Sequence, residues 1–297
     1  MTSQSTAKIA ARIQPVGGPR ARGRDLVALT KPGIVIGNVL MTAAGLALAP
    51  AAPMAVVIAA LMGTALLIGA CGALNMVFES DIDARMNRTR NRPVADGRIS
   101  SAAAATFGVA LFLLGALTLA EFTNLLTATL GILACIIYVG IYTPLKQRSF
   151  AAVPVGAVAG ALPPVIGWFA AGGAPSVAAL MLFSAIFVWQ IPHFMAIGLR
   201  RWKDYRDAGF RIGANPERLQ SSVAWIRLTT VLLQLVTLGA VVTAGGVGFA
   251  ILGFGAALVM LLASFRPAPD PVVWARRVFL ASLFYLPAFA LGAFLPF

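Results

Sequence analysis

The sequence predicts an all-α, polytopic membrane protein with nine transmembrane helices. Hydrophobic residues make up 59% of the 297 residues and charged residues only 11%, a composition that excludes an ordinary soluble domain. The apolar residues gather in nine runs, and runs of roughly 17 to 25 residues are long enough to cross the bilayer core as helices. The lysines and arginines fall on alternate connections between these runs. These three observations together predict the fold class.

The nine predicted spans follow one another without a linker that would separate domains. We place them at residues 33–50, 54–78, 101–120, 123–142, 153–172, 177–199, 225–243, 247–265 and 278–296. Every second connection is short, whereas those after the second and sixth spans are long. Because binding and catalytic residues concentrate on long connections, function is expected on the face that carries these two.

Prolines interrupt the fifth and sixth spans. Pro163 and Pro164 lie inside the fifth span, and Pro192 lies inside the sixth. Broken helices at membrane depth are tolerated where neighbouring protein or a cavity satisfies the freed backbone groups. The two spans are therefore predicted either to be kinked or to form the wall of a cavity.

The distribution of charge predicts the orientation. All 23 lysines and arginines lie in the N-terminal segment or after the second, fourth, sixth and eighth spans. The positive-inside rule then places the N-terminus in the cytoplasm, in a bacterial inner membrane or, as the alternative, a mitochondrial one. The net charge of +13 reflects this topology and does not indicate nucleic-acid binding. Residues 1–24 are predicted to be a disordered basic cytoplasmic tail and residues 25–297 a single membrane domain.

The most informative segment follows the second span. Asn75, Glu79 and Asp83 are four residues apart, so on a continuing helix they share one face. Two carboxylates at a membrane edge repel each other unless a cation lies between them. Oxygen ligands of this kind suit Mg²⁺ that bridges to substrate phosphates. Five arginines follow, among them Arg88 and Arg92, and guanidinium groups bind phosphate oxygens. The alternative is a solvated, salt-bridged loop.

A second acidic cluster follows the sixth span, on the same predicted side of the membrane. Lys203, Asp204, Tyr205 and Asp207 lie within five residues, and the two carboxylates are three residues apart on one helical face. Two such clusters predict two metal sites that face one diphosphate, because a diphosphate leaves as an anion only when positive charge receives it. Asp204 is the stronger candidate, since Asp207 can equally be a surface residue.

Three further polar residues are candidates. Tyr142 and Lys146 close the fourth span; the Tyr142 ring can face a carbocation or mark the membrane interface, and Lys146 can bind phosphate. His193, the single histidine, lies within the sixth span, where an ionisable group is a functional candidate. Its alternative is a neutral, hydrogen-bonded side chain.

Cys71 and Cys135 lie inside spans with no second cysteine nearby, and they are predicted to be packing residues.

Seven short segments carry a resemblance to a known family. They are residues 29–33 (Leu-Thr-Lys-Pro-Gly), 75–83 (Asn-Met-Val-Phe-Glu-Ser-Asp-Ile-Asp), 86–93, 142–146 (Tyr-Thr-Pro-Leu-Lys), 160–168, 189–194 (Trp-Gln-Ile-Pro-His-Phe) and 203–205. The chain resembles the UbiA superfamily of intramembrane prenyltransferases, and within it the protohaem IX farnesyltransferase (haem O synthase) family. Each segment alone is weakly specific, but the ordered set is highly specific.

The resemblance implies a UbiA-type bundle of nine helices around a central cavity open to the cytoplasm. It also implies Mg²⁺-dependent ionisation of farnesyl diphosphate and transfer of the farnesyl group to a vinyl group of haem b. Haem b would be a substrate, and a downstream haem-modifying enzyme or terminal oxidase would be a partner. The expected ligands of one Mg²⁺ are Asn75, Glu79 and Asp83, and those of a second are Asp204 and Asp207. The expected substrate contacts are Arg88, Arg92, Lys146, Lys203 and Tyr205 for the diphosphate side, Tyr142 for the allylic cation, and His193 for haem.

The sequence departs from the superfamily pattern at three places. Met76 and Glu79 stand where Asp is preferred, Ala152 stands where Asn is frequent, and Phe-Arg-Ile-Gly-Ala replaces the usual Ile-Pro-Met-Leu-Pro after Gly209. Two other functions are left open, namely prenylation of an aromatic quinone precursor and membrane transport. Transport predicts charged groups deep in several spans, whereas here His193 is the one deep ionisable group.

Overall fold

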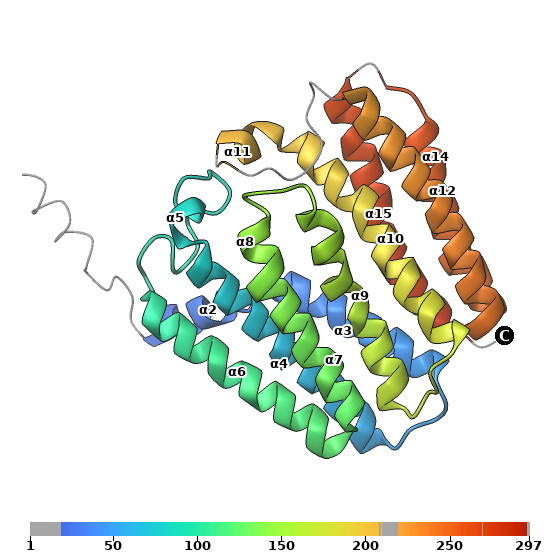
Figure 1. Cartoon of the computed structure of the whole chain (residues 1–297), viewed down its shortest axis with the longest axis horizontal. Coiled ribbons are helices and arrows are strands. Elements are labelled where there is room, and N and C mark those ends of the chain that lie inside the picture. The colour runs from blue at the N-terminus through green and yellow to red at the C-terminus, as the bar shows by residue number, and fades with distance from the viewer. Residues whose placement is uncertain (1–18, 208, 210–218, 269, 296–297) are drawn as a thin grey trace, which may run out of the picture.

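The structure, a computed structural model, describes residues 19–207, 209, 219–268 and 270–295, and within these ranges it is helical with no β-strand (Figure 1). The elements are α2 (Pro19–Leu29), α3 (Pro32–Leu48), α4 (Met54–Phe78), α5 (Ser80–Asp83), α6 (Ser101–Phe122), α7 (Leu125–Cys135), η1 (Ile136–Tyr142), α8 (Thr143–Leu145), α9 (Ala152–Ala170), α10 (Val177–Arg200), α11 (Trp202–Asp207), α12 (Leu219–Ala244), α13 (Val247–Phe249), η3 (Ala250–Phe254), α14 (Gly255–Phe265) and α15 (Pro271–Ala293). The predicted all-α class is confirmed.

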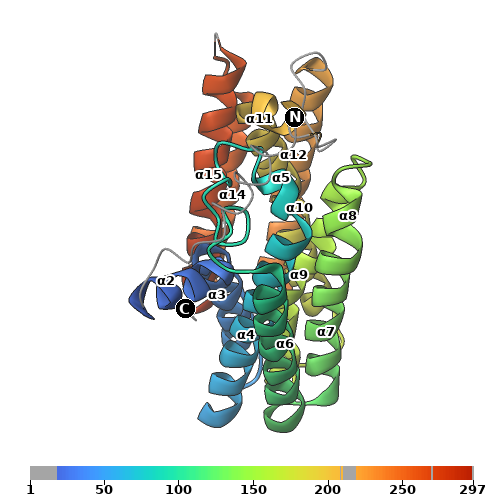
Figure 2. The ribbon, with the colours of Figure 1, turned by 90° about the vertical axis from the view of Figure 1, so that its left-hand side faces the viewer.

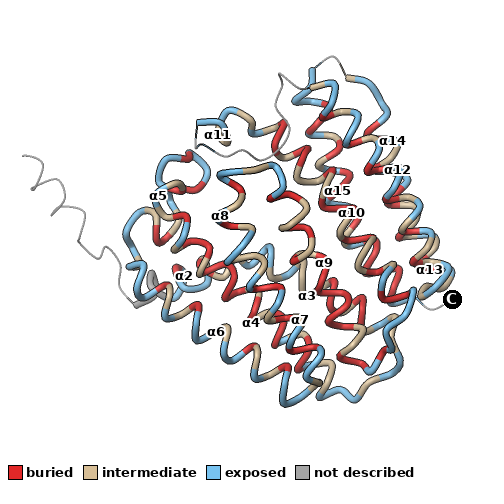
Figure 3. Tube along the Cα trace, viewed as in Figure 1, coloured by how far each residue is buried: buried red, intermediate tan, exposed pale blue. Residues whose placement is uncertain are grey.

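The long helices are apolar enough to cross a membrane. Within the described ranges, eight helices qualify by length and composition, or up to nine if α2 and α3, which are bent by 53° from each other, form one broken span. Large apolar side chains point outward, as at Leu117 (58% exposed) and Val242 (76% exposed), and Figure 3 shows such exposed positions along the outer helices. Lipid covers surfaces of this kind, so the chain is a multi-pass membrane protein.

The bend between α2 and α3 comes from residues 30–32. Lys31 has a left-handed backbone conformation with φ of 54°, which is uncommon for a residue other than glycine. Pro32 opens α3, where its missing N–H removes no helical hydrogen bond. Helix α2 begins at Pro19, inside the segment that the sequence assigned to the basic tail. Residues 1–18, the remainder of that tail prediction, lie outside the described residues.

Two helices start earlier than predicted and take in basic residues. Because α15 starts at residue 271, Arg276 and Arg277 are helical, and their assignment to a connection was wrong; Arg227, at the start of the predicted span 225–243, lies well inside α12. Long side chains make this tolerable, since the charged head reaches polar groups at the helix ends. The Nε of Arg227 donates to the carbonyl of Ser264 at 3.2 Å, and Arg277 donates to the carbonyl of Arg266 at 3.1 Å.

Helices α3 and α9 cross closely at the centre of the bundle. A Cβ on Gly45 would lie 1.8 Å from the carbonyl oxygen of Pro164, and a Cβ on Gly167 would lie 2.0 Å from that of Thr42. Only glycine allows the two backbones this approach. Pro163 and Pro164 are buried inside α9, which runs unbroken from residue 152 to residue 170.

The helices form two groups joined by α3, α9 and α10. Helices α4, α6 and α7 pack together on one side, and α12, α14 and α15 on the other (Figures 1 and 2). The short helices α5, α8 and α11 lie at one end of the bundle, at the top of Figure 1. The connections after the second, fourth and sixth predicted spans therefore meet at this end.

The two cysteines are neighbours, contrary to the prediction. Cys71 on α4 and Cys135 at the end of α7 are buried, and their Sγ atoms are 3.1 Å apart. Sequence separation hid the contact, because 64 residues lie between them while α4 and α7 pack side by side. Both belong to an apolar cluster with Leu67, Leu119 and Ala128, so their packing role agrees with the prediction.

Candidate active site

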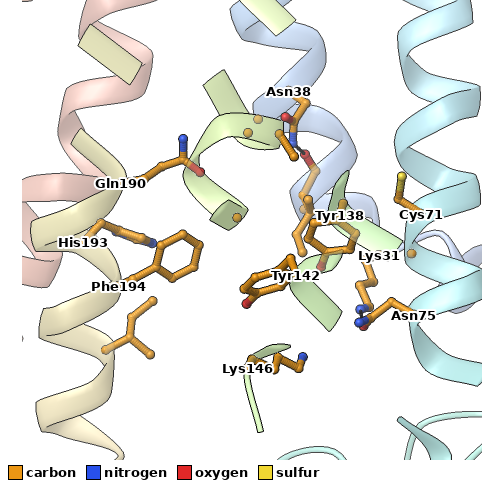
Figure 4. A pocket seen from close by; sticks show the side chains of 18 of the residues that line it. Lys31, Asn38, Cys71, Asn75, Tyr138, Tyr142, Lys146, Gln190, His193 and Phe194 are labelled. Carbon is orange, nitrogen blue, oxygen red and sulfur yellow. Dashed lines mark hydrogen bonds between the residues drawn. The ribbon is translucent and has the colours of Figure 1, made fainter. Parts of the chain in front are cut away.

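A cavity of about 740 Å³ lies between α3, α4, α9, α10 and α15 and extends to α5. Figure 4 shows Lys31 and Asn75 on one side of it, Gln190 and His193 on the other, and Tyr142 between them. The side chains that define its two faces differ in kind. We call the first face the ionic wall (Lys31, Asn75, Glu79, Asp83, Arg92 and Lys146) and the second the aromatic wall (Trp189, His193, Phe194 and Phe279).

The predicted trio of the first motif comes together on the ionic wall. Asn75, Glu79 and Asp83 line the cavity and are 1%, 2% and 2% exposed. The helix does not continue regularly, because Glu79 separates α4 from α5. The four-residue hydrogen bonds nevertheless continue, from Glu79 N–H to the carbonyl of Asn75 (3.0 Å) and from Asp83 N–H to that of Glu79 (2.7 Å). The three side chains therefore keep one face across the break.

Each side chain of this trio meets a cation from another segment through one of its oxygens. Lys31 donates to Oδ1 of Asn75, Lys146 pairs with Oε1 of Glu79, and Arg92 pairs with Oδ2 of Asp83 at 2.6 Å. Burial lowers the pKa of Lys146, while the adjacent Glu79 carboxylate acts in the opposite direction. Removing one partner of a buried ion pair destabilises the fold, because the other charge is then left buried without compensation. The ionic wall is thus a compact set of alternating charges.

A π-helical turn places two tyrosines beside this wall. In η1 the N–H of Thr143 bonds the carbonyl of Tyr138, five residues back, and such turns are frequent at functional sites. The hydroxyl of Thr143 accepts a hydrogen bond from Nδ2 of Asn75 at 3.0 Å and so fixes that amide. Tyr138 and Tyr142 both line the cavity with ring centroids 5.2 Å apart. The Nζ of Lys146 lies 5.4 Å from the Tyr142 ring.

The aromatic wall is built by α10 and α15. The ring of His193 stacks on Trp189 (centroids 4.7 Å apart) and on Phe279 (5.3 Å). Behind these rings the indole N–H of Trp189 donates to the carbonyl of Ser282 at 2.8 Å. The side-chain amide of Gln190, which follows Trp189 in α10, donates to the carbonyl of Ala157 on α9 at 3.1 Å. Trp189 and Gln190 are therefore held by hydrogen bonds between helices, and the stacked rings of Trp189, His193 and Phe279 line the cavity beside them.

The second acidic cluster is placed at the edge of the site. Tyr205 lines the cavity, whereas Lys203, Asp204 and Asp207 are not among the lining residues. Asp204 faces Arg201 at 3.8 Å, and Asp207 is exposed and pairs with Arg206 at 3.2 Å. Burial raises the pKa of Tyr205. The segment after Gly209, whose departure from the family pattern the sequence showed, lies outside the described residues.

Several lining residues were missed as site residues. Lys31 stands in the Leu-Thr-Lys-Pro-Gly segment at the same predicted membrane edge as Asn75, and this proximity was the available signal. Arg88 and Arg92 were expected and do line the cavity, as do the unexpected Arg200 and Arg201. Phe279 and its neighbour Ser282 carried no sequence signal, since α15 is about 90 residues from His193.

The profile of the UbiA prenyltransferase family matches residues 38–291 of this chain. Protoheme IX farnesyltransferase of Anaeromyxobacter dehalogenans (strain 2CP-C) is 40% identical over 286 residues, which cover 93% of this chain and 95% of that protein. The protein of the same name from Myxococcus xanthus (strain DK1622) is 41% identical over 88% of this chain and 90% of its own length.

Solved structures share the fold at low sequence identity. A structure of digeranylgeranylglyceryl phosphate synthase has a TM-score of 0.73 at 14% identity and covers 91% of this chain and 98% of its own. A UbiA homolog from Archaeoglobus fulgidus bound to GPP and Mg²⁺ has a TM-score of 0.66 at 14% identity, covering 91% and 99%. At these identities the likeness establishes the common architecture.

Proposed function

This chain belongs to the UbiA prenyltransferase family, and we propose that it transfers the farnesyl group of farnesyl diphosphate to a vinyl group of haem b, which yields haem O and diphosphate. The observation that carries the proposal is one cavity that joins an ionic wall to a neutral aromatic wall. Relatives of nearly the same length are named protoheme IX farnesyltransferase. The proposed site of action is the inner membrane of a bacterium, with a haem-modifying enzyme or terminal oxidase downstream.

The ionic wall is chemically suited to Mg²⁺ and diphosphate. Asn75, Glu79 and Asp83 offer an amide oxygen and two carboxylates, all buried beside the cavity. Mg²⁺ is held by one or two protein carboxylates together with substrate phosphates and water. A cluster of three acidic or histidine ligands is therefore unnecessary, and the described part of the chain contains none. We assign the first Mg²⁺ to this trio.

The departing diphosphate needs more positive charge than one ion supplies. When bound, Mg²⁺ stabilises the charge that develops on the phosphate oxygens. Lys146, Arg88 and Arg92 line the same part of the cavity and can bind the remaining oxygens. Of the second cluster we assign Asp204 to a second Mg²⁺, because it lies beside Tyr205, which lines the cavity. Lys203 and the exposed Asp207 lie on the outer side of that site, where their contribution would be small.

The reaction itself follows from charge separation within the cavity. The carbon–oxygen bond of farnesyl diphosphate breaks and the diphosphate keeps the electron pair. The ring of Tyr142, close to Lys146, is positioned to stabilise the allylic cation through its π face. The ring of Tyr138 lies beside it, tilted by 32°. The π electrons of the vinyl group of haem then form the new carbon–carbon bond, which leaves a positive charge on the other vinyl carbon. Water adds at that carbon and releases one proton, so the product carries a hydroxyl group beside the new bond.

The acceptor requires a different surface. Haem b is flat and largely apolar, with two propionates that favour cations at its polar edge. The aromatic wall offers stacked rings around His193, which is proposed to orient haem or bind its iron. Arg200 and Arg201, at the end of α10, line the cavity nearby and can bind carboxylates in bidentate fashion.

Haem analysis in a host that lacks its own haem O synthase tests the proposal. Expression of the full chain should produce a haem whose mass exceeds that of haem b by one farnesyl group and one hydroxyl group. The Asp83→Asn variant, expressed to the same level, should produce little of it. Prenylation of a hydroxybenzoate without any change in haem would assign the acceptor to the aromatic quinone precursors instead.

A further inference from the structure

The hydrogen bonds of Ser282 determine which nitrogen of His193 carries the proton. The hydroxyl of Ser282 lies 2.7 Å from Nδ1 of His193 and donates to the carbonyl of Phe279 at 2.6 Å. A carbonyl can only accept, and a hydroxyl has one proton. Both contacts can be hydrogen bonds at the same time only if that proton lies on the bond to Phe279 and Ser282 accepts from Nδ1–H of His193. A neutral imidazole that is protonated at Nδ1 keeps its free lone pair on Nε2.

The free nitrogen belongs to a ring on the cavity surface. His193 lines the cavity, and Figure 4 places it on the wall opposite Lys31 and Asn75. Its one side-chain hydrogen bond within the described residues is the Nδ1 bond to Ser282. Nε2 is therefore left as an electron-pair donor on the aromatic wall, which is the form of imidazole that binds a metal ion.

Ser282 also fixes the orientation of the ring. Its carbonyl accepts from the indole of Trp189 at 2.8 Å, while its hydroxyl accepts from His193. Trp189 and Phe279 both stack on the imidazole, at interplanar angles of 24° and 29°. Ser282 on α15 therefore fixes the orientations of both Trp189 and His193 on α10. A partner that holds the second nitrogen of a ligating histidine is the usual arrangement around a metal-bound imidazole.

We propose that Nε2 of His193 is an axial ligand to the iron of the haem acceptor and that Ser282 is its positioning residue. The inference rests on the proposed function and deepens it by assigning the contact that seats the acceptor. Ser282 touches neither haem nor farnesyl diphosphate; it acts by holding the tautomer and the plane of the imidazole. If Ser282 had only a structural role, it would join α10 to α15 without affecting how haem binds.

Spectroscopy of the purified full chain in detergent tests the assignment. Haem b titrated into the protein should give a shifted Soret band, and His193→Ala should abolish that shift. Added imidazole should restore it in His193→Ala, because the free base can occupy the vacated space and ligate the iron. Ser282→Ala should weaken haem binding about 10-fold, as expected for the loss of a partner that orients a metal ligand. Ser282→Thr, which retains the hydroxyl, should recover most of the affinity.

Ser264 supplies the matched control. It is also a fully buried helical serine that bonds another hydroxyl, that of Thr230 at 2.9 Å, but it does not line the cavity. Ser264→Ala should leave the haem spectrum unchanged. The KM for haem should rise in Ser282→Ala while the KM for farnesyl diphosphate stays the same.

The outcomes separate the inference from the function on which it rests. A wild-type protein that farnesylates haem, with a Soret band that His193→Ala and Ser282→Ala leave unaltered, would overturn the ligand assignment alone. A wild-type protein that neither binds nor farnesylates haem would overturn the proposed function.

Discussion

The two walls of the cavity satisfy their polar groups in opposite ways. On the ionic wall, the buried carboxylates of Glu79 and Asp83 are paired with Lys146 and Arg92. On the aromatic wall, the partners of His193 among the described residues are a neutral hydroxyl and aromatic rings. Carboxylates that can meet a cation thus lie on the ionic wall, whereas the aromatic wall presents rings and has a charged group, Arg200 over Phe279, at its margin. The contrast suggests that one wall activates the farnesyl donor and the other holds the acceptor.

The strongest way to break this contrast is to remove charge from the ionic wall without changing its shape. Asp83→Asn is expected to lower Mg²⁺-dependent turnover at least about 10²-fold, roughly 2.7 kcal/mol of transition-state stabilisation. Binding of haem, measured by its Soret band, should not change. Asp96→Asn is the control, since Asp96 pairs with Arg98 outside the cavity. Near-normal turnover of Asp83→Asn at saturating Mg²⁺ would remove the metal-ligand role.

Removing a cation from the same wall should affect both stability and activity. Lys146→Met leaves Glu79 buried without the partner that it has in the structure, and breaking a buried pair from one side costs about 3–5 kcal/mol. The thermal unfolding midpoint of the purified protein should therefore fall. The double variant Glu79→Gln/Lys146→Met should recover much of this midpoint but not the turnover. Recovery of both would show that the pair serves stability alone.

The acceptor wall is tested through its charged margin. Arg200 lies over the Phe279 ring at 4.4 Å, so Arg200→Ala should raise the KM for haem about 10-fold, the loss of a charge-assisted contact of roughly 1.4 kcal/mol. The KM for farnesyl diphosphate should stay constant. Arg206→Ala is a matched control, because Arg206 stacks on Trp202 and does not line the cavity. If both variants had the same KM for haem, Arg200 would have no part in acceptor binding.

The same contrast explains how much could be predicted from the sequence. Helices were predictable because apolar runs are local, and most observed bounds lie within a few residues of the predicted ones. The acidic part of the ionic wall was predictable because Asn75, Glu79 and Asp83 repeat at helical spacing. Its cations were harder to find: Lys31 reaches Asn75 from 44 residues away. The support of the aromatic wall could not be predicted, because nothing in the sequence distinguishes Ser282 from the span serines Ser184 and Ser264 until α15 packs against α10.

The second acidic cluster should show the smallest effects and so sharpens the boundary of the ionic wall. Asp204 is a quarter exposed and lies 3.8 Å from Arg201, which lines the cavity. Asp207 is 68% exposed at its side chain and pairs only with its neighbour Arg206 among the described residues. We therefore expect Asp204→Asn to lower turnover about 10-fold, roughly 1.4 kcal/mol, and Asp207→Asn to stay close to wild type. Turnover measured across Mg²⁺ concentrations distinguishes a metal-ligand role of Asp204 from a role in an ion pair. A metal ligand predicts that excess Mg²⁺ partly rescues Asp204→Asn, whereas an ion pair that only orders α11 predicts the same deficit at every Mg²⁺ concentration.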